Sequence, residues 1–163
     1  MALSSATRDR LHTQGYVNVD EEMLASTAPW LRWSPSICTG IIVLGTALAS
    51  PWILWALVPF ALAGALMTRH PFDYIYNLGV SRLSGTSPLP EHGAPRRFAC
   101  GMAAAWVAAT GAAFAGGAPA AGYALGGVLS AVGALVSTTH FCIPSTIYGL
   151  VFGKPVACEQ EPA

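Results

Sequence analysis

"PAAGYALGGVLSAVGALVSTT", residues 119–139, contains no charged side chain over its whole length. A bilayer is crossed by about 20 predominantly apolar helical residues, which is close to the length of this stretch. Pro119 stands at its first position, where a helix tolerates a missing backbone N–H. Residues 119–139 therefore predict a transmembrane helix.

Three further apolar stretches precede it, at about residues 35–50, 51–68 and 98–115. The chain of 163 residues is 53% hydrophobic and only 10% charged, whereas soluble domains carry about 25% charged residues. Backbone groups in lipid must be satisfied within the segment, so each span should be a helix. The expected fold is all-α, an integral membrane four-helix bundle over residues 35–153, with a cytoplasmic N-terminal segment at 1–34 and a cytoplasmic tail at 154–163.

The four spans form two hairpins, whose turns are "ASP" at 49–51 and "AGGAP" at 115–119. Neither turn contains a charge, and both lie on the same side of the membrane. Every cation of the chain falls on the other side: Arg8, Arg10, Arg32, Arg69, Arg82, Arg96, Arg97 and Lys154. The positive-inside rule then predicts a multi-pass protein with both termini and the 69–97 loop in the cytoplasm.

The 69–97 loop has an amphipathic pattern near its start. Phe72, Ile75 and Tyr76 recur at helical spacing, with Asp73 and Asn77 on another face. This predicts a short amphipathic helix at the membrane interface between spans two and three. The segment is either a connector or a surface on which Phe72, Ile75 and Tyr76 dock a partner.

Small residues follow one face of spans three and four. They are Gly101, Ala105, Ala109 and Ala113 in the third span, and Gly122, Gly126, Ser130 and Ala134 in the fourth. Small residues let membrane helices approach closely, so the two ridges predict that spans three and four pack together. The alternative is that Ala and Gly are simply common in membrane helices.

The reactive side chains lie near one membrane depth at the cytoplasmic ends of the spans. Cys38, Cys100 and Cys142 with His70 and His140 could hold a soft metal, and the two histidines could ligate haem. The sequence contains no CxxC, HxxxH or CxxCH spacing. No cofactor is predicted in the leading interpretation, in which these residues are interfacial histidines and small apolar cysteines.

No catalytic residue is predicted. The span interiors contain no ionisable group of the kind that ion-coupled transporters use, and GxSxG, P-loop and HExxH motifs are missing. A net charge of zero gives no reason to expect nucleic acid. The leading hypothesis is a non-catalytic integral membrane protein, an accessory or assembly subunit that contacts lipid and other membrane subunits. The alternatives are a thiol- or metal/haem-dependent redox membrane protein and a small-solute permease.

Several short motifs resemble a family of small four-span bacterial membrane proteins described as a domain of unknown function. They are "VDEEM" at 19–23, "RHPFDYIYN" at 69–77, "SPL" at 87–89, "PRRFA" at 95–99 and "FCIPSTIYGL" at 141–150. The resemblance implies location in the bacterial inner (cytoplasmic) membrane, and it brings no established activity. Members often end in Phe-Cys-x-x-Cys-x-x-Tyr. Phe141, Cys142 and Tyr148 match this pattern, but Ser145 replaces the second cysteine.

"TTHFCIPSTIYG", residues 138–149, is interpreted as the end of the fourth helix at the cytoplasmic interface. Pro144 would stop the helix. Cys142 would then follow a helix C-terminus, where the dipole disfavours a thiolate. With Ser145 in place of a resolving cysteine, this predicts a packing role for Cys142.

Overall fold

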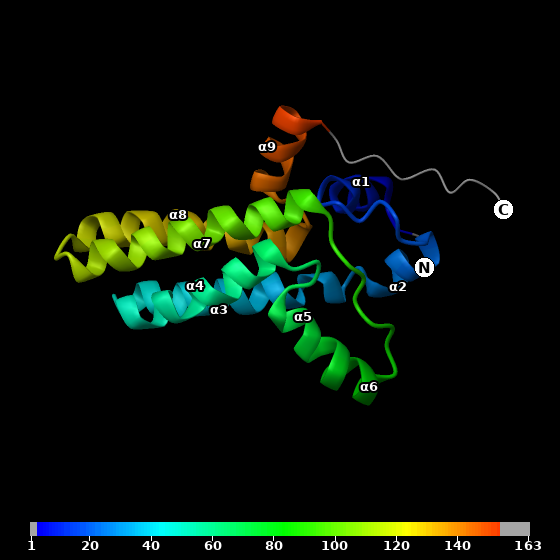
Figure 1. Cartoon of the computed structure of the whole chain (residues 1–163), viewed down its shortest axis with the longest axis horizontal. Helices are drawn as coiled ribbons and strands as arrows, with labels where there is room; N and C mark the ends of the chain where they lie inside the picture. The colour runs from blue at the N-terminus through cyan, green and yellow to red at the C-terminus, as the bar shows by residue number, and fades with distance from the viewer. Residues whose placement is uncertain (1–2, 154–163) are drawn as a thin grey trace.

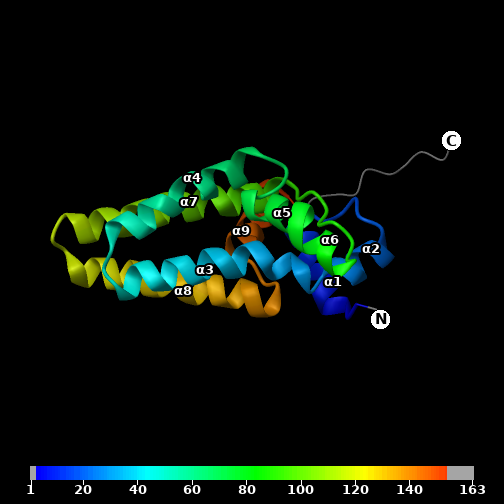
Figure 2. The ribbon, with the colours of Figure 1, turned by 90° about the horizontal axis from the view of Figure 1, so that it is seen from below.

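The computed structural model describes residues 3–153, which are helical and contain no strand. Four long helices lie side by side (Figure 1): α3 (Trp33–Ala47), α4 (Pro51–Leu66), α7 (Ala94–Ala115) and α8 (Pro119–Thr139). We call these four helices, with the turns that join α3 to α4 and α7 to α8, the bundle, and we call the remaining described residues the cap. Within the bundle α4 packs mainly against α7 and α3 against α8 (Figure 2).

Two of the bundle helices are long and apolar enough to cross a membrane. They are α7 with 22 residues and α8 with 21, or about 32 Å each at 1.5 Å per residue. The other two are shorter, with 15 residues in α3 and 16 in α4. The α4 helix reaches the required length only together with residues 71–84, and the chain bends by 84° between them. The all-helical prediction is confirmed. By length and apolar composition, two of the described helices could cross a membrane, or three segments if the bent pair is one span, and not the four that the sequence predicts.

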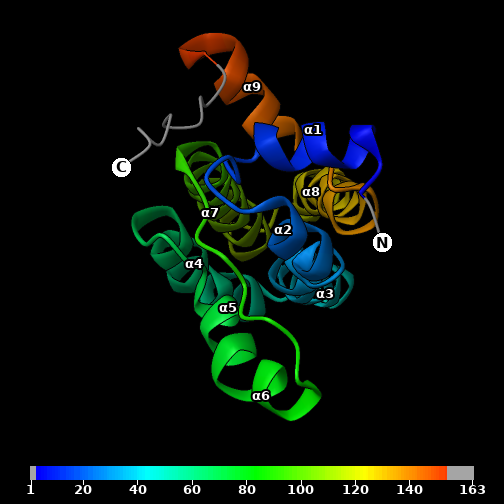
Figure 3. The ribbon, with the colours of Figure 1, turned by 90° about the vertical axis from the view of Figure 1, so that its right-hand side faces the viewer.

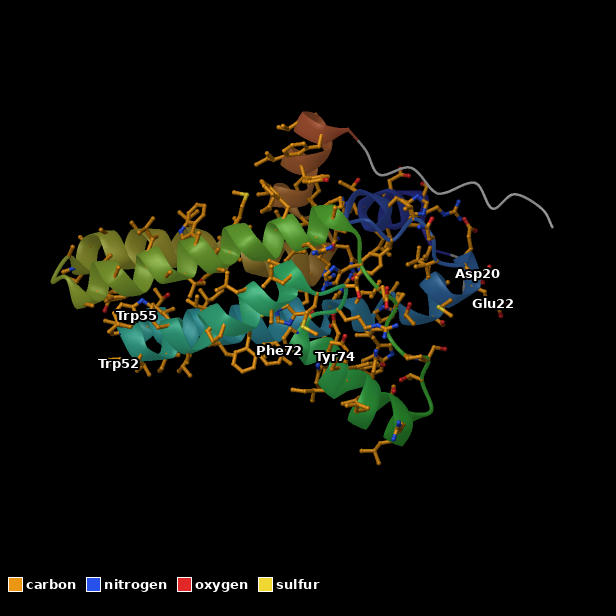
Figure 4. All side chains as sticks on the ribbon, viewed as in Figure 1. Asp20, Glu22, Trp52, Trp55, Phe72 and Tyr74 are labelled. Atoms are coloured by element: carbon orange, nitrogen blue, oxygen red, sulfur yellow. The ribbon has the colours of Figure 1, made fainter. Side chains whose placement is uncertain are left out.

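Both hairpin turns lie at the end of the bundle farthest from the cap (Figure 1). Ala49 and Gly117 in these turns adopt positive φ angles, 46° and 73°. Trp52 and Trp55 lie toward this end, whereas the charged Asp20 and Glu22 lie in the cap (Figure 4). The bundle therefore has an apolar, aromatic end and a polar end.

The small residues of α7 and α8 do not form two ridges that face each other. A side chain added at Gly126 would meet Thr46 of α3, and one added at Gly101 would approach Ala65 of α4 at 3.7 Å. Ala105 is exposed and Ser130 is half-buried. The helices α7 and α8 do contact each other, but Gly101 and Gly126 face helices of the other hairpin, which differs from the pairing expected from the sequence.

Aromatic side chains make the contact between α7 and α8 instead. The indole N–H of Trp106 donates to the carbonyl of Leu125 at 3.2 Å. The rings of Phe114 and Tyr123 meet edge to face at 5.2 Å. Gly122 is the one predicted glycine that faces this interface, since a side chain there would meet the Phe114 ring.

The cap has its own apolar core. Its helical elements are α1 (Ser5–Thr13), α2 (Glu21–Thr27), the 3₁₀ turn η1 (Trp30–Arg32), α5 (Pro71–Ile75), the π turn η2 (Tyr76–Val80), α6 (Ser81–Ser84) and α9 (Ile143–Phe152). Leu11, Tyr16, Leu24, Leu31, Tyr76 and Leu89 are buried together. The N-terminal segment and the Pro/Gly-rich loop are therefore packed against each other.

Two segments leave the polar end of the bundle in opposite directions. The α5–α6 segment turns away on one side and α9 on the other (Figure 1, Figure 3). Each carries exposed apolar side chains: Leu83 is 91% exposed and Leu150 is 82% exposed. The first segment falls where the sequence predicts an amphipathic helix. The α9 helix was not predicted, because residues 138–149 were interpreted as the end of the preceding helix.

Candidate functional site

The reactive side chains lie where the cap meets the bundle, and three of them form one small group. The Cys38 sulfur is 3.9 Å from Nε2 of His70. Cys100 lies close to the same histidine. A Cβ atom added at Gly64 would be 3.2 Å from the Cys100 sulfur and 3.2 Å from Nε2 of His70, so both side chains border Gly64. Nδ1 of His70 accepts a hydrogen bond from the N–H of Phe72 at 3.3 Å, so the ring proton belongs on Nε2, toward Cys38.

The five residues suggested for a metal or haem do not form one ligand set. His140 and Cys142 each have their own partners, which are Arg32 for the histidine and Ser145 for the cysteine. Across residues 3–153 no three His, Cys, Asp or Glu side chains are arranged to hold a metal ion. The fourth cysteine, Cys158, lies outside the described residues.

A buried arginine connects the helices at this end. One Nη atom of Arg96 donates to Oγ of Ser34 at 2.9 Å, and the other donates to Oε1 of Gln14 at 3.3 Å. Its guanidinium also lies over the Tyr16 ring, 5.6 Å from the centroid. Burial raises the pKa of the Tyr16 phenol, although the charge of Arg96 acts to lower it. Arg96 thus joins α1, α3 and α7 through neutral partners.

Two buried polar side chains near Arg96 have atoms without a partner among the described residues. Asp73 accepts the backbone N–H of His70 with one carboxylate oxygen, while its other oxygen is unpaired. Both ring nitrogens of His92 are unpaired as well. Burial, with the charge of Arg96 as the second cause, lowers the pKa of His92 to about 3. His92 is therefore neutral at ordinary pH.

Three side chains of the cap donate hydrogen bonds to residues at the end of α8. Arg10 donates to the carbonyl of Thr139 at 2.8 Å, and Gln14 donates to the carbonyl of His140 at 2.6 Å. Arg32 donates from Nε to Nε2 of the His140 ring at 2.9 Å. The last carbonyls of a helix lack partners within it, so these donors satisfy groups that would otherwise be unpaired.

His140 is expected to make the fold sensitive to mild acid. Burial first, and then the charges of Arg32, Arg96 and Arg10, lower its pKa from 6.5 to about 4. Below pH 6.5 the unfolded chain binds a proton that the folded chain refuses until about pH 4, so stability is lost as the pH falls through this range. The loss attributed to His140 should reach about 2 kcal/mol near pH 5, measured by unfolding in detergent.

The control is His140→Asn, because asparagine tolerates the left-handed backbone of this residue, with φ 59°. At pH 8 the variant reports only the loss of the Arg32 contact. Between pH 8 and pH 5 its stability should fall less than that of the unchanged protein. His92 acts in the same direction, so part of the dependence should remain. Equal slopes for both proteins would contradict the role of His140.

The location of Cys142 corrects the expectation that it follows a helix C-terminus. The α8 helix ends at Thr139, and Cys142 is the N-cap of the new helix α9. The hydroxyl of Ser145 donates to the Cys142 sulfur at 3.1 Å and shares its proton with the carbonyl of Pro95, 3.2 Å away. Cys142 therefore lies at the start of a helix, whereas the sequence places it after the end of one.

The three residues suggested for partner docking do not share a surface. Phe72 is buried and stacks on Phe60 at 5.2 Å. Tyr76 is buried against Trp30, with ring centroids 5.3 Å apart. Only Ile75 is exposed. Phe72 instead packs the α5–α6 segment against α4 of the bundle, and Tyr76 packs it against η1 of the cap.

Comparison with known proteins gives one match. The model of a family described as "Domain of unknown function (DUF4395)" matches residues 28–152. No curated protein and no solved structure matches the chain. Because the match covers most of the sequence, the chain belongs to this family, and the resemblance to an uncharacterised family is confirmed.

Proposed function

We propose that this member of the DUF4395 family is a four-span protein of the bacterial inner membrane that serves as an accessory or assembly subunit of a membrane complex. Its cap lies in the cytoplasm, and both termini are on that side. The observation that carries the proposal is the pair of segments that leave the bundle at its polar end. Both present exposed apolar side chains, including Leu83 and Leu150.

Such segments fit a membrane interface. A helix that lies in the headgroup region buries one apolar face while its backbone stays parallel to the membrane. The sharp bend of 84° after α4 gives residues 71–84 this direction relative to the bundle. With the interface at this depth, α7 and α8 extend through the hydrocarbon region, which is about 30 Å thick.

The shorter helices are compatible with four spans. The turn η1 continues directly into α3, so that residues 30–47 form one helical stretch. A hydrophobic stretch shorter than the bilayer is accommodated by local thinning at a modest cost. Exposed apolar residues follow both helices, as shown by Leu44, Leu48, Trp52 and Leu62. Lipid or a neighbouring subunit would cover these side chains.

The polar end supports a subunit better than a substrate site. Arg96, Gln14, Ser34 and the end of α8 hydrogen-bond to one another, so they join helices within the protein. The partner would use the exposed sides of α5–α6 and α9. The first segment is anchored by the buried Phe72 and Tyr76, and α9 packs through Tyr148 on Phe98 of α7.

A specific observation favours a second candidate function, a thiol-dependent redox role. Cys142 stands at the N-terminus of α9, within reach of the Ser145 hydroxyl. A thiol there would exchange with a disulfide of another molecule, forming a mixed disulfide and releasing the second sulfur of that molecule as a thiol. No local disulfide can form at this place, because Ser145 replaces the second cysteine.

One purification separates the two candidates. The tagged protein is extracted in mild detergent as the unchanged chain, as Cys142→Ser and as the matched control Cys38→Ser. The subunit proposal predicts the same co-purifying polypeptides for Cys142→Ser as for the unchanged chain. Loss of those polypeptides in Cys142→Ser alone, together with a mixed disulfide in the unchanged chain, would favour the redox role. A protein that purifies without any partner would contradict the subunit proposal.

A further inference from the structure

An open groove runs along the lipid-facing side of α7, next to the end of α4. Its volume is about 560 Å³, and it is lined by Ala65, Ala94, Arg97, Phe98, Gly101 and Met102. Its lining comes from the last turn of α4 and the first half of α7, and these parts of the two helices lie toward the cap (Figure 1). Ala105 extends the groove to a length of about 16 Å along α7. This length is about half the hydrocarbon thickness, or one leaflet of a bilayer.

The groove has a cation at its polar end and no acid to neutralise it. Arg97 is half-buried, and its Nε and one Nη atom donate to the carbonyls of Ala65 and Leu66 at 3.0 and 2.9 Å. Within residues 3–153 the ion pairs are Arg8–Glu21 and Arg69–Glu91, so no described carboxylate pairs with Arg97. A guanidinium has five N–H donors. The two bonds to α4 fix its direction and leave donors for a further acceptor.

We propose that this groove binds one anionic phospholipid, with a phosphate oxygen on Arg97 and an acyl chain along Phe98, Gly101 and Met102. The proposal rests on the membrane location proposed above. A basic side chain between helices on the cytoplasmic side is suited to an anionic headgroup. The apolar floor below Arg97 suits an acyl chain and gives a water-soluble anion nothing further to bind.

The helix α9 packs against Phe98, which lines the groove. The Phe98 ring packs on Tyr148 of α9 with centroids 5.6 Å apart. Phe98 therefore stands between the groove and the segment expected to lie in the interface. The next cation, Arg96, is directed away into the buried contacts with Gln14 and Ser34, so Arg97 is the headgroup contact.

The test uses two variants that act on opposite ends of the groove. Arg97→Gln removes the charge. Gly101→Leu adds an apolar side chain at the floor of the groove, where its Cβ would be in ordinary contact with Ala65 at 3.7 Å. The matched controls are Arg82→Gln on the exposed α6 and Gly127→Leu on α8, where an added Cβ meets nothing within 4 Å.

Each full-length protein is reconstituted into vesicles of equal parts phosphatidylcholine and phosphatidylglycerol, extracted in neutral detergent, and weighed with its retained lipid by native mass spectrometry. The unchanged protein should retain phosphatidylglycerol over phosphatidylcholine by about fivefold. Arg97→Gln should lose this preference, Gly101→Leu should retain little lipid of either kind, and both controls should match the unchanged protein.

Two outcomes overturn the proposal in distinguishable ways. Flotation of the protein with the vesicles, combined with equal retention of both lipids by the unchanged chain, overturns the lipid site alone. Failure to float contradicts the membrane location and the lipid site together. Should Arg97→Gln fold poorly because the end of α4 loses its donors, Gly101→Leu still decides the result, since it leaves Arg97 in place.

Discussion

Gly126→Leu is expected to lower the free energy of unfolding in detergent by about 3 kcal/mol, because an over-packed site forces helices apart. The direction follows from the contact between α8 and α3. A side chain at Gly126 would collide with the oxygen and both carbons of the Thr46 side chain. Thr46 is buried, so it has no free space into which to rotate.

The control is the next residue of the same helix. Gly127→Leu makes the same change in helix propensity, but nothing lies within 4 Å of an added Cβ there. Its stability should equal or exceed that of the unchanged chain. Equal destabilisation by both variants would show that loss of glycine, and not the contact with α3, is responsible.

A second variant identifies the helix that Gly126 faces. The smaller change Gly126→Ala should be partly rescued by Thr46→Ala on α3, since contacting residues couple in a double-mutant cycle. The sequence pattern instead predicts that Gly126 contacts the third span, which is α7. If a truncation on α7 rescued Gly126→Ala and Thr46→Ala did not, the contact with α3 would be contradicted.

The sequence predicts the helices well where an apolar run is uninterrupted by charged residues. The stretch 119–139 coincides with α8, and the second stretch begins at Pro51, as α4 does. A charge-free run that starts with proline defines both. The pattern failed at α9 because Ile143–Phe152 is as apolar as the span before it. Pro144 was interpreted as a helix stop, although it stands in the first turn of α9, where proline also fits.

The contacts of the polar end could not be predicted from local pattern. Arg96 looks like an ordinary interfacial charge in the sequence. Its burial depends on Gln14, 82 positions away, and on Ser34, 62 positions away. Gly126 likewise faces Thr46 because the two hairpins pack against each other. A single sequence does not show which residues so far apart in the chain are in contact.

We propose that the bundle crosses the membrane with its cap inside the cell. The charge distribution motivates it, since Arg8, Arg32 and Arg69 belong to the cap end and the hairpin turns carry none. Moving even one arginine through a bilayer is costly. The orientation should therefore be uniform, and labelling at the two ends should differ almost completely.

Single cysteines at Ser5, Ser84 and Ala118, all exposed, test this most directly in a chain whose native cysteines are replaced by serine. Intact cells are treated with a membrane-impermeant maleimide, and a second sample is treated after the membrane is opened. The proposed orientation predicts labelling of Ala118→Cys in intact cells, and labelling of Ser5→Cys and Ser84→Cys only after opening. Labelling of Ser84→Cys from outside, or the same labelling at all three positions, would contradict it.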